Sequence, residues 1–156
     1  MFKVTTTSPQ ETQKLATRIV DALVVPGEAP GNATIVALEG DLGAGKTMFV
    51  KGVADHLGVT EVVTSPTFVI EKIYNLAPSA PWKRLVHIDA YRLDGKEELG
   101  TIGWDELATD PGNLICIEWP LQVGTGVPER AVWLEFEAVD DTTRRISGSV
   151  DLPDNV

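Results

Sequence analysis

The stretch that most constrains this chain is Gly40-Asp41-Leu42-Gly43-Ala44-Gly45-Lys46-Thr47, which fits the pattern G-x-x-x-x-G-K-[ST]. A β-branched and apolar run at positions 33–38 precedes it and predicts a buried strand. Apolar residues at helical spacing follow and predict a helix that ends near Gly58. Those residues are Phe49, Val50, Val53 and Leu57. A loop of this pattern between a strand and a helix predicts a phosphate-binding P-loop.

The residue types in this loop account for the chemistry that it predicts. Gly43 and Gly45 can adopt backbone angles that a side chain would forbid, so the loop can turn its N–H groups toward a phosphate. The first turn of the following helix adds free N–H groups and the positive end of its dipole. We expect Lys46 to reach the β- and γ-phosphates and the Thr47 hydroxyl to ligate Mg²⁺. The alternative is a chance match in a glycine-rich turn, which the flanking strand and helix disfavour.

Two further apolar runs end in a carboxylate. Positions 85–88 lead into Asp89, and positions 114–117 lead into Glu118. In an open α/β sheet ligands gather at the carboxyl ends of strands, so both acids are candidates for Mg²⁺ or for positioning the attacking water. His87 precedes Asp89 by two residues and faces the same side of its strand. A lone histidine in a strand is more often a core residue than a catalyst, and we do not assign it the role of a base.

The segment 64–67 follows the predicted helix and carries the hydroxyl groups of Thr64, Ser65 and Thr67. In P-loop enzymes the corresponding segment often passes the γ-phosphate and its Mg²⁺, and it orders or relaxes with the nucleotide. The alternative is a hydroxylated turn before a strand over 69–74. Composition alone favours this alternative, because Ser and Pro are common turn residues.

The composition limits the functions that the chain can have. A formal net charge of −10 argues against gripping nucleic acid over a broad surface, because phosphate contacts need Lys and Arg. No apolar run approaches the roughly 20 residues needed to span a membrane. Positions 1–10 lack the pattern of a signal peptide, so we expect a cytoplasmic protein without a membrane partner. The single cysteine, Cys116, lies in an apolar run and is expected to be a buried small hydrophobe.

Two further stretches of the sequence are predicted to be helical. Ser8 and Glu11 predict a capping box, with Glu11 reaching back, for a helix over 9–23 that presents an apolar stripe to the core. Positions 96–108 predict a second helical stretch that its glycines break in two.

The C-terminal part predicts an antiparallel hairpin from an alternating strand over 131–137 and a strand over 144–150. The length suits one compact domain, so we expect residues 1–156 to form a single P-loop ATPase domain. The expected fold is α/β and P-loop NTPase-like, with a central, mostly parallel sheet flanked by helices and a C-terminal antiparallel hairpin.

Four strings together resemble the TsaE family, the bacterial P-loop ATPases of tRNA threonylcarbamoyladenosine synthesis. They are the P-loop at 40–47, Ser65-Pro66-Thr67-Phe68, His87-Ile88-Asp89-Ala90-Tyr91-Arg92-Leu93 and Ile117-Glu118-Trp119-Pro120. They occur in the order and at the spacing of the family, and the resemblance covers nearly the whole chain. The P-loop alone would be unspecific, whereas the four strings together are specific.

The resemblance implies a function that spacing alone does not show. It implies ATP binding and hydrolysis with Mg²⁺, together with two partner proteins, TsaB and TsaD. These partners transfer a threonylcarbamoyl group to the adenosine beside the anticodon of tRNA. The ATPase supports turnover of their complex and does not perform the transfer, so tRNA is a partner only indirectly.

The resemblance also assigns roles by position. It implies that Lys46 and Thr47 hold phosphate and Mg²⁺, with Lys46 among the catalytic residues. It implies that Asp89 and Glu118 serve the metal or the hydrolysis, with Trp119 beside the nucleotide. The hydroxyl segment at 64–67 matches a switch-like segment.

The expected nucleotide-binding residues are the loop itself and three positions near the base. The loop residues are Asp41, Leu42, Gly43, Ala44, Gly45, Lys46, Thr47 and Met48. By analogy the base lies near the start of the N-terminal helix, at Gln10 and Thr12, and near Arg144 of the C-terminal hairpin. The family usually has a hydroxyl residue at the Met48 position, so we expect modestly weaker nucleotide binding here.

Two other functions remain open. In the first, the chain is a nucleotide-gated interaction module in which ATP binding matters more than hydrolysis. In the second, it is a small-molecule or nucleotide kinase, which usually needs a closing lid with arginines. Arg84 and Arg92 are the only arginines in the sequence between the P-loop and the Glu-Trp-Pro string, so the kinase fits poorly. Arg92 is conceivable as an arginine finger in cis, but no residue must play that part. We therefore expect low intrinsic ATPase activity that partners stimulate.

Overall fold

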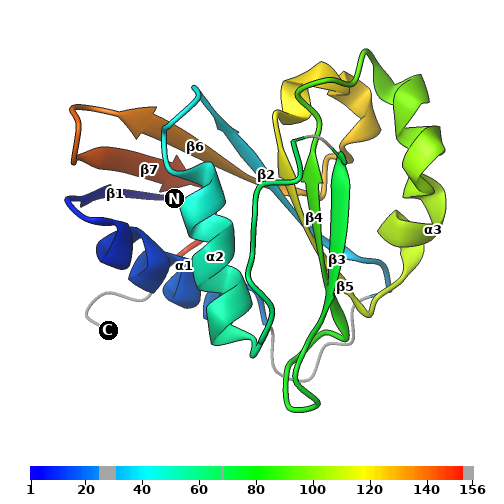
Figure 1. The fold of residues 1–156 in the computed structure, drawn as a ribbon, viewed down its shortest axis with the longest axis horizontal. Helices are drawn as coiled ribbons and strands as arrows, with labels where there is room; N and C mark the ends of the chain where they lie inside the picture. Colours follow the sequence, from blue (N-terminus) through cyan, green and yellow to red (C-terminus); the bar gives the residue numbers. More distant parts are fainter. Residues whose placement is uncertain (25–30, 68, 153–156) are drawn as a thin grey trace.

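A seven-stranded mixed sheet forms the centre of the computed structural model, which describes residues 1–24, 31–67 and 69–152. The strand order is β1-β7-β6-β2-β5-β4-β3, and helices cover both faces (Figure 1). The strands are β1 (Phe2–Thr6), β2 (Thr34–Gly40), β3 (Glu71–Asn75), β4 (Arg84–Asp89), β5 (Asn113–Glu118), β6 (Val132–Ala138) and β7 (Arg144–Gly148). The helices are α1 (Pro9–Leu23), α2 (Lys46–His56) and α3 (Trp104–Thr109), with 3₁₀ segments η1 (Lys96–Ile102), η2 (Pro120–Gln122) and η3 (Gly124–Gly126).

The four central strands, β6, β2, β5 and β4, run parallel to one another. The outer pairs β3–β4, β6–β7 and β1–β7 are antiparallel. This arrangement confirms the expected α/β fold with a mostly parallel centre and a C-terminal hairpin. The carboxyl ends of β2, β5 and β4 therefore meet at one edge of the sheet, the edge from which the P-loop leaves β2.

Two apolar cores lie on opposite faces of the sheet because side chains alternate along each strand. One core packs α1 and α2 against residues such as Leu38, Leu85 and Leu114. The other packs η1 and α3 against residues such as Ile88 and Ile117. The same alternation puts His87, Asp89, Cys116 and Glu118 on the face that α2 covers. The fully buried Cys116 agrees with its expected place in the core, and burial raises the pKa of its thiol to about 12.

Helix α1 begins and ends where the pattern predicts. Ser8 caps it by accepting a hydrogen bond from the Glu11 amide at 3.1 Å. The Glu11 carboxylate reaches back one residue further than a capping box requires, since it accepts from the amide of Thr7 at 2.6 Å. The close crossing of α1 and α2 depends on Gly52, where an added Cβ would lie 2.7 Å from Cα of Gln13. Among the described helices, none is long and apolar enough to cross a membrane.

Several boundaries differ from those expected; β7, for example, ends at Gly148 rather than at position 150. The strand predicted over 69–74 begins only at Glu71, because Ile70 has a left-handed backbone (φ 69°) that interrupts extended structure. The helical stretch over 96–108 breaks at Gly103 (φ 73°), while Gly100 lies inside η1. Most of the expected loop at 26–32 lies outside the described residues.

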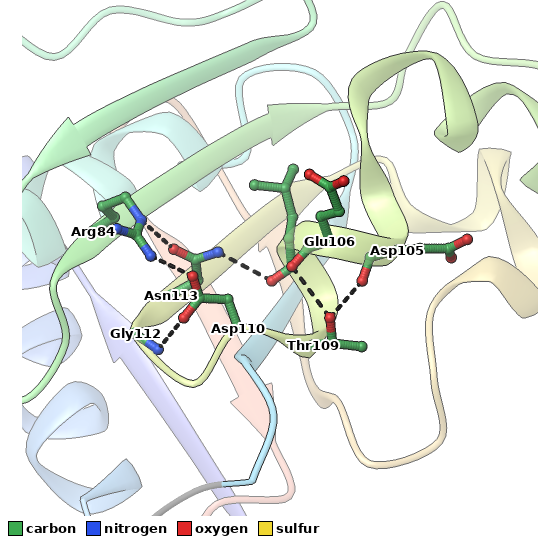
Figure 2. Close-up of polar contacts among 8 residues, drawn as sticks. Arg84, Asp105, Glu106, Thr109, Asp110, Gly112 and Asn113 are labelled. Carbon is green, nitrogen blue, oxygen red and sulfur yellow. Dashed lines mark hydrogen bonds and ion pairs between the residues drawn. The ribbon is translucent and has the colours of Figure 1, made fainter.

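A polar network ties α3 to the amino ends of β4 and β5, at the sheet edge opposite the P-loop (Figure 2). The buried Asn113 accepts from Nε of Arg84 at 2.8 Å and donates to the carbonyl of Leu107 at 3.1 Å. Arg84 also pairs with Asp110, whose carboxylate accepts from the Gly112 amide. These bonds are the reason that we regard the cluster as structural.

Candidate nucleotide-binding site

The loop between β2 and α2 has the backbone that its glycines predict. Gly43 (φ 79°) and Gly45 (φ 104°) both take left-handed conformations, and Gly45 is the N-cap of α2. Among the described residues no side chain caps this helix, so the N–H groups of its first turn are available to an anion. Gly40 is needed for a different reason, because a Cβ there would lie 2.4 Å from the carbonyl oxygen of Phe136.

Lys46 is buried at the start of α2 with its ammonium group inside the site. It donates a hydrogen bond to the Gly40 carbonyl, and its Nζ lies 3.5 Å from the centroid of the Trp119 ring. Burial lowers the pKa of Lys46, while the charges of Glu118 and Glu39 oppose that shift. Trp119 itself has a left-handed backbone (φ 59°), a costly conformation that places its ring against Lys46.

The two acids predicted at strand ends lie side by side. Asp89 and Glu118 are register partners on the adjacent parallel strands β4 and β5, and both are buried. The Thr47 hydroxyl lies 3.3 Å and 3.4 Å from the two carboxylate oxygens of Glu118. A hydroxyl group from α2 and two carboxylates from the sheet therefore converge at one point.

The segment 64–67 reaches the same point through Thr67. Its hydroxyl donates to Oδ2 of Asp89 at 2.9 Å, and it also shares a 2.7 Å hydrogen bond with the Ser65 hydroxyl. The other oxygen of Asp89 accepts from the Tyr91 amide at 2.9 Å. Ser65 and Thr67 line the site, whereas the exposed Thr64 does not.

A cavity of about 510 Å³ extends from this point along the P-loop to the start of α1 and the β6–β7 turn. Its lining includes most of the residues predicted from sequence: Leu42, Gly43, Gly45, Lys46, Thr47, Met48, Asp89, Glu118, Thr12 and Arg144. Three predicted contacts, Asp41, Ala44 and Gln10, are not among the lining residues. Ala44 is fully buried, and Gln10 is exposed on α1.

The cavity also has walls that the sequence did not identify. They are Thr7, Ser8 and Pro9 before and at the start of α1, and Asp141 and Thr142 in the β6–β7 turn. Thr12, which also lines the cavity, is buried and shares a 2.8 Å hydrogen bond with the Thr6 hydroxyl. The pairing of β1 with β7 brings these distant segments together, and nothing local in the sequence marks it.

The residues present fit a magnesium ion held jointly with phosphate. Within the described residues, no group of three or more His, Cys, Asp or Glu side chains could hold a metal ion alone. Mg²⁺ bound with a nucleotide needs only one or two carboxylates, because phosphate oxygens, a hydroxyl and water complete its shell. Thr47, Asp89 and Glu118 offer that smaller set of oxygen donors.

His87 is a site neighbour that sequence reasoning left in the core. Its side chain is fully buried, as expected, but its Nε2 lies 2.5 Å from Oε2 of Glu118. The spacing that put His87 on the face of Asp89 was the available signal. That Glu118 on β5 lies beside His87 could not be predicted without the strand order.

Comparisons with known proteins agree with one another. The family described as "Threonylcarbamoyl adenosine biosynthesis protein TsaE" matches residues 6–146. The "tRNA threonylcarbamoyladenosine biosynthesis protein TsaE" of Bacillus subtilis (strain 168) is 36% identical over 149 residues, covering 94% of this chain and 84% of the relative. The protein of the same name from Treponema pallidum (strain Nichols) is 37% identical over 124 residues, covering 79% and 87%. A crystal structure of Bacillus subtilis YdiB superposes with a TM-score of 0.72 at 30% identity, covering 96% of this chain and 84% of that one.

Proposed function

Because the chain belongs to the TsaE family of threonylcarbamoyl adenosine biosynthesis proteins, we propose that it binds and hydrolyses ATP with Mg²⁺ in support of tRNA modification. The partners proposed are TsaB and TsaD, and the modified base is the adenosine next to the anticodon. The proposal places the chain in the cytoplasm, where tRNA is modified.

The observation that carries the proposal is the convergence of Lys46, Thr47, Asp89 and Glu118 on one cavity beside an uncapped helix start. The N–H groups of the loop and of α2 bind phosphate oxygens. Lys46 exchanges its contacts with Gly40 and Trp119 for the β- and γ-phosphates. These groups stabilise the negative charge that the transferred phosphoryl group carries in the transition state.

The oxygen donors of the site have a second task. Thr47, Asp89 and Glu118 hold Mg²⁺, directly or through water, and Glu118 or the segment 64–67 orients the attacking water. When bound, Mg²⁺ would neutralise negative charge on the phosphates. The remaining volume of the cavity, between α1 and the β6–β7 turn, takes the nucleoside, with Arg144 along its wall.

We expect low intrinsic ATPase activity because the site has few cationic side chains that could stabilise the transition state. Among the described residues, Arg144 is the one arginine that lines the cavity, and its guanidinium donates to the carbonyls of Asp140 and Thr143. Its Nη1 is therefore engaged by its own hairpin. A partner protein that supplies a cation would speed hydrolysis.

The test is ATP hydrolysis by the chain alone and with TsaB and TsaD from the same source. Stimulation by the pair, abolished by Lys46→Ala, is the expected result. Equal rates with and without the pair, together with no binding to it, would contradict the proposed function. Free tRNA is expected to bind weakly, because the net charge is −10.

A second function, a nucleotide-gated interaction module, is favoured by the bond from Thr67 to Asp89, which couples the site to an exposed segment. Glu118→Ala separates the two functions. If the variant binds ATP and TsaB–TsaD but does not hydrolyse ATP, and tRNA modification persists, binding alone is the function. Loss of modification together with hydrolysis supports the ATPase.

A further inference from the structure

His87 and Glu118 form a pair beneath the floor of the cavity. Their side chains are 0% and 4% exposed, and Nε2 of His87 lies 2.5 Å from Oε2 of Glu118. A carboxylate only accepts hydrogen bonds, so the ring nitrogen is the donor and the ring carries its proton on Nε2. The bond therefore fixes one oxygen of Glu118 from below.

The direction of this bond follows from the strand register. His87 is the register partner of Cys116, while Glu118 is the register partner of Asp89. The imidazole therefore reaches diagonally along β5, toward the sheet edge, instead of straight across. On its other side the Glu118 carboxylate contacts the Thr47 hydroxyl at 3.3 Å and 3.4 Å. Glu118 is thus held between a strand residue and the first turn of α2.

The burial of an imidazole here needs a reason. In the described part of the chain, Nδ1 of His87 has no hydrogen-bond partner, so the ring makes a single polar contact, the one with Glu118. An apolar residue of similar size would fill this place in the core without the cost of burying a polar ring. His87 is also absent from the cavity lining, so it does not touch a ligand there. These facts place His87 behind Glu118 and point to a role that acts through Glu118.

We propose that His87 is a positioning residue, which holds the Glu118 carboxylate in the orientation that faces Thr47 and the metal-binding edge of the site. Its consequence for Mg²⁺ rests on the proposed function. A free glutamate has several rotatable bonds, and a buried donor that fixes one oxygen leaves the second oxygen aimed at the ion. Loss of such supporting hydrogen bonds weakens metal binding about 10- to 100-fold in other proteins.

The first test needs no nucleotide. In ¹⁵N-edited NMR spectra of the whole chain, we expect a ring Nε2–H signal of His87 that exchanges slowly with solvent. Glu118→Ala should shift that signal and speed its exchange. Absence of a protected Nε2–H signal, or a signal that Glu118→Ala leaves unchanged, would overturn the proposal whatever the chain does with ATP.

The second test measures the Mg²⁺ concentration that half-saturates binding of a non-hydrolysable ATP analogue. His87→Leu keeps an apolar volume but removes the donor, and we expect the half-saturating concentration to rise about 10-fold. His87→Gln carries an N–H donor at a similar reach and should restore most of the affinity. Leu85→Ala is the matched control, because Leu85 is fully buried on the same strand and face, two residues further from the site.

The outcomes separate the possible failures. An unchanged Mg²⁺ requirement in His87→Leu, or an equal rise in Leu85→Ala, would overturn the positioning role. Since His87 acts through Glu118, adding His87→Leu to Glu118→Ala should cause no further loss, whereas independent losses would contradict the proposal. If the unaltered chain binds no nucleotide, the proposed function fails, and the NMR result alone decides on His87. If His87→Leu does not fold, His87→Gln and the NMR signal remain as tests.

Discussion

Thr67 donates a 2.9 Å hydrogen bond to Asp89 across 22 residues of sequence, and this bond joins the segment before β3 to the end of β4. A second bond runs beside it, from the Asp89 amide to the Ile70 carbonyl at 2.8 Å. Ile70, which accepts the second bond, has a left-handed backbone that a β-branched residue rarely adopts. The segment is therefore held to β4 against local backbone strain.

Thr67→Val should loosen this segment, because valine keeps the shape of threonine and removes the hydroxyl donor. A hydrogen bond to a charged group is worth about 1.5 kcal/mol or more, so local opening should become roughly tenfold more frequent. Hydrogen exchange of the Asp89 amide measures this opening. Thr60→Val, on an exposed threonine, is the control, and equal exchange rates in both variants would contradict the prediction.

Gly52→Ala should destabilise the protein even though alanine is the better helix former. Helix propensity favours alanine by about 1 kcal/mol. The added Cβ would lie 2.7 Å and 2.9 Å from backbone atoms of Gln13, which cannot move without shifting α1, and such overpacking costs about 1–3 kcal/mol. We expect a net loss of about 1 kcal/mol in urea unfolding, with Lys51→Ala on the same helix as control. A more stable Gly52→Ala variant would contradict the prediction and show that α1 can shift away from α2 at little cost.

Asn113→Ala should lower the free energy of unfolding by about 2 kcal/mol, because Nε of Arg84 loses its acceptor and the Leu107 carbonyl loses one of its two donors (Figure 2). Nucleotide binding should stay unchanged, since Asn113 begins the strand that Glu118 ends. Urea unfolding and an ATP titration measure the two effects. Asn32→Ala removes an exposed asparagine as a control. If folded Asn113→Ala binds ATP more weakly, the network at the amino end of β5 also affects the binding site at its carboxyl end, which would contradict the prediction.

Glu71→Gln should stabilise the protein at neutral pH. Burial raises the pKa of Glu71, and its Oε2 has no hydrogen-bond partner among the described residues. The penalty for the charged form is present at pH 7 and falls as the pH drops through the raised pKa, where the folded state takes up a proton. The gain from Gln, below about 1 kcal/mol for a partly exposed group, should therefore vanish below pH 4. Melting temperatures at pH 7 and below pH 4 test whether the substitution stabilises the protein and whether the gain is lost in acid. Glu129→Gln, on an exposed glutamate, is the control.

Local patterns predicted the part of the site that local structure builds. The loop glycines, Lys46 and Thr47 depend only on a strand, a turn and a helix that are consecutive in the chain. The apolar runs before Asp89 and Glu118 likewise placed both acids at strand ends. That β5 lies between β2 and β4, and so sets the acids side by side, is a property of the strand order, which neither run determines.

Contacts between distant segments could not be predicted in this way. The bond from His87 to Glu118 depends on the register of two strands, and the bond from Thr67 to Asp89 depends on how a loop returns to β4. The composition of 64–67 even favoured an ordinary turn. Gln10 was placed near the base by analogy with the family, and in the structure it is exposed on α1, while Ser8 and Thr12 line the cavity.

The strand order also sets the route by which another molecule could influence the site from outside. Glu118 ends β5, which is hydrogen-bonded on both sides, whereas β3 is the last strand of the sheet and has one neighbour. A protein that pulled on β3 or the segment before it would reach Asp89 through the Thr67 hydroxyl and the Ile70 carbonyl, one strand away. The same pull would have to cross a whole further strand to reach Glu118. Asp89 is thus joined directly to the segment at the outermost strand, whereas Glu118 is joined to it at one remove, through His87 on β4.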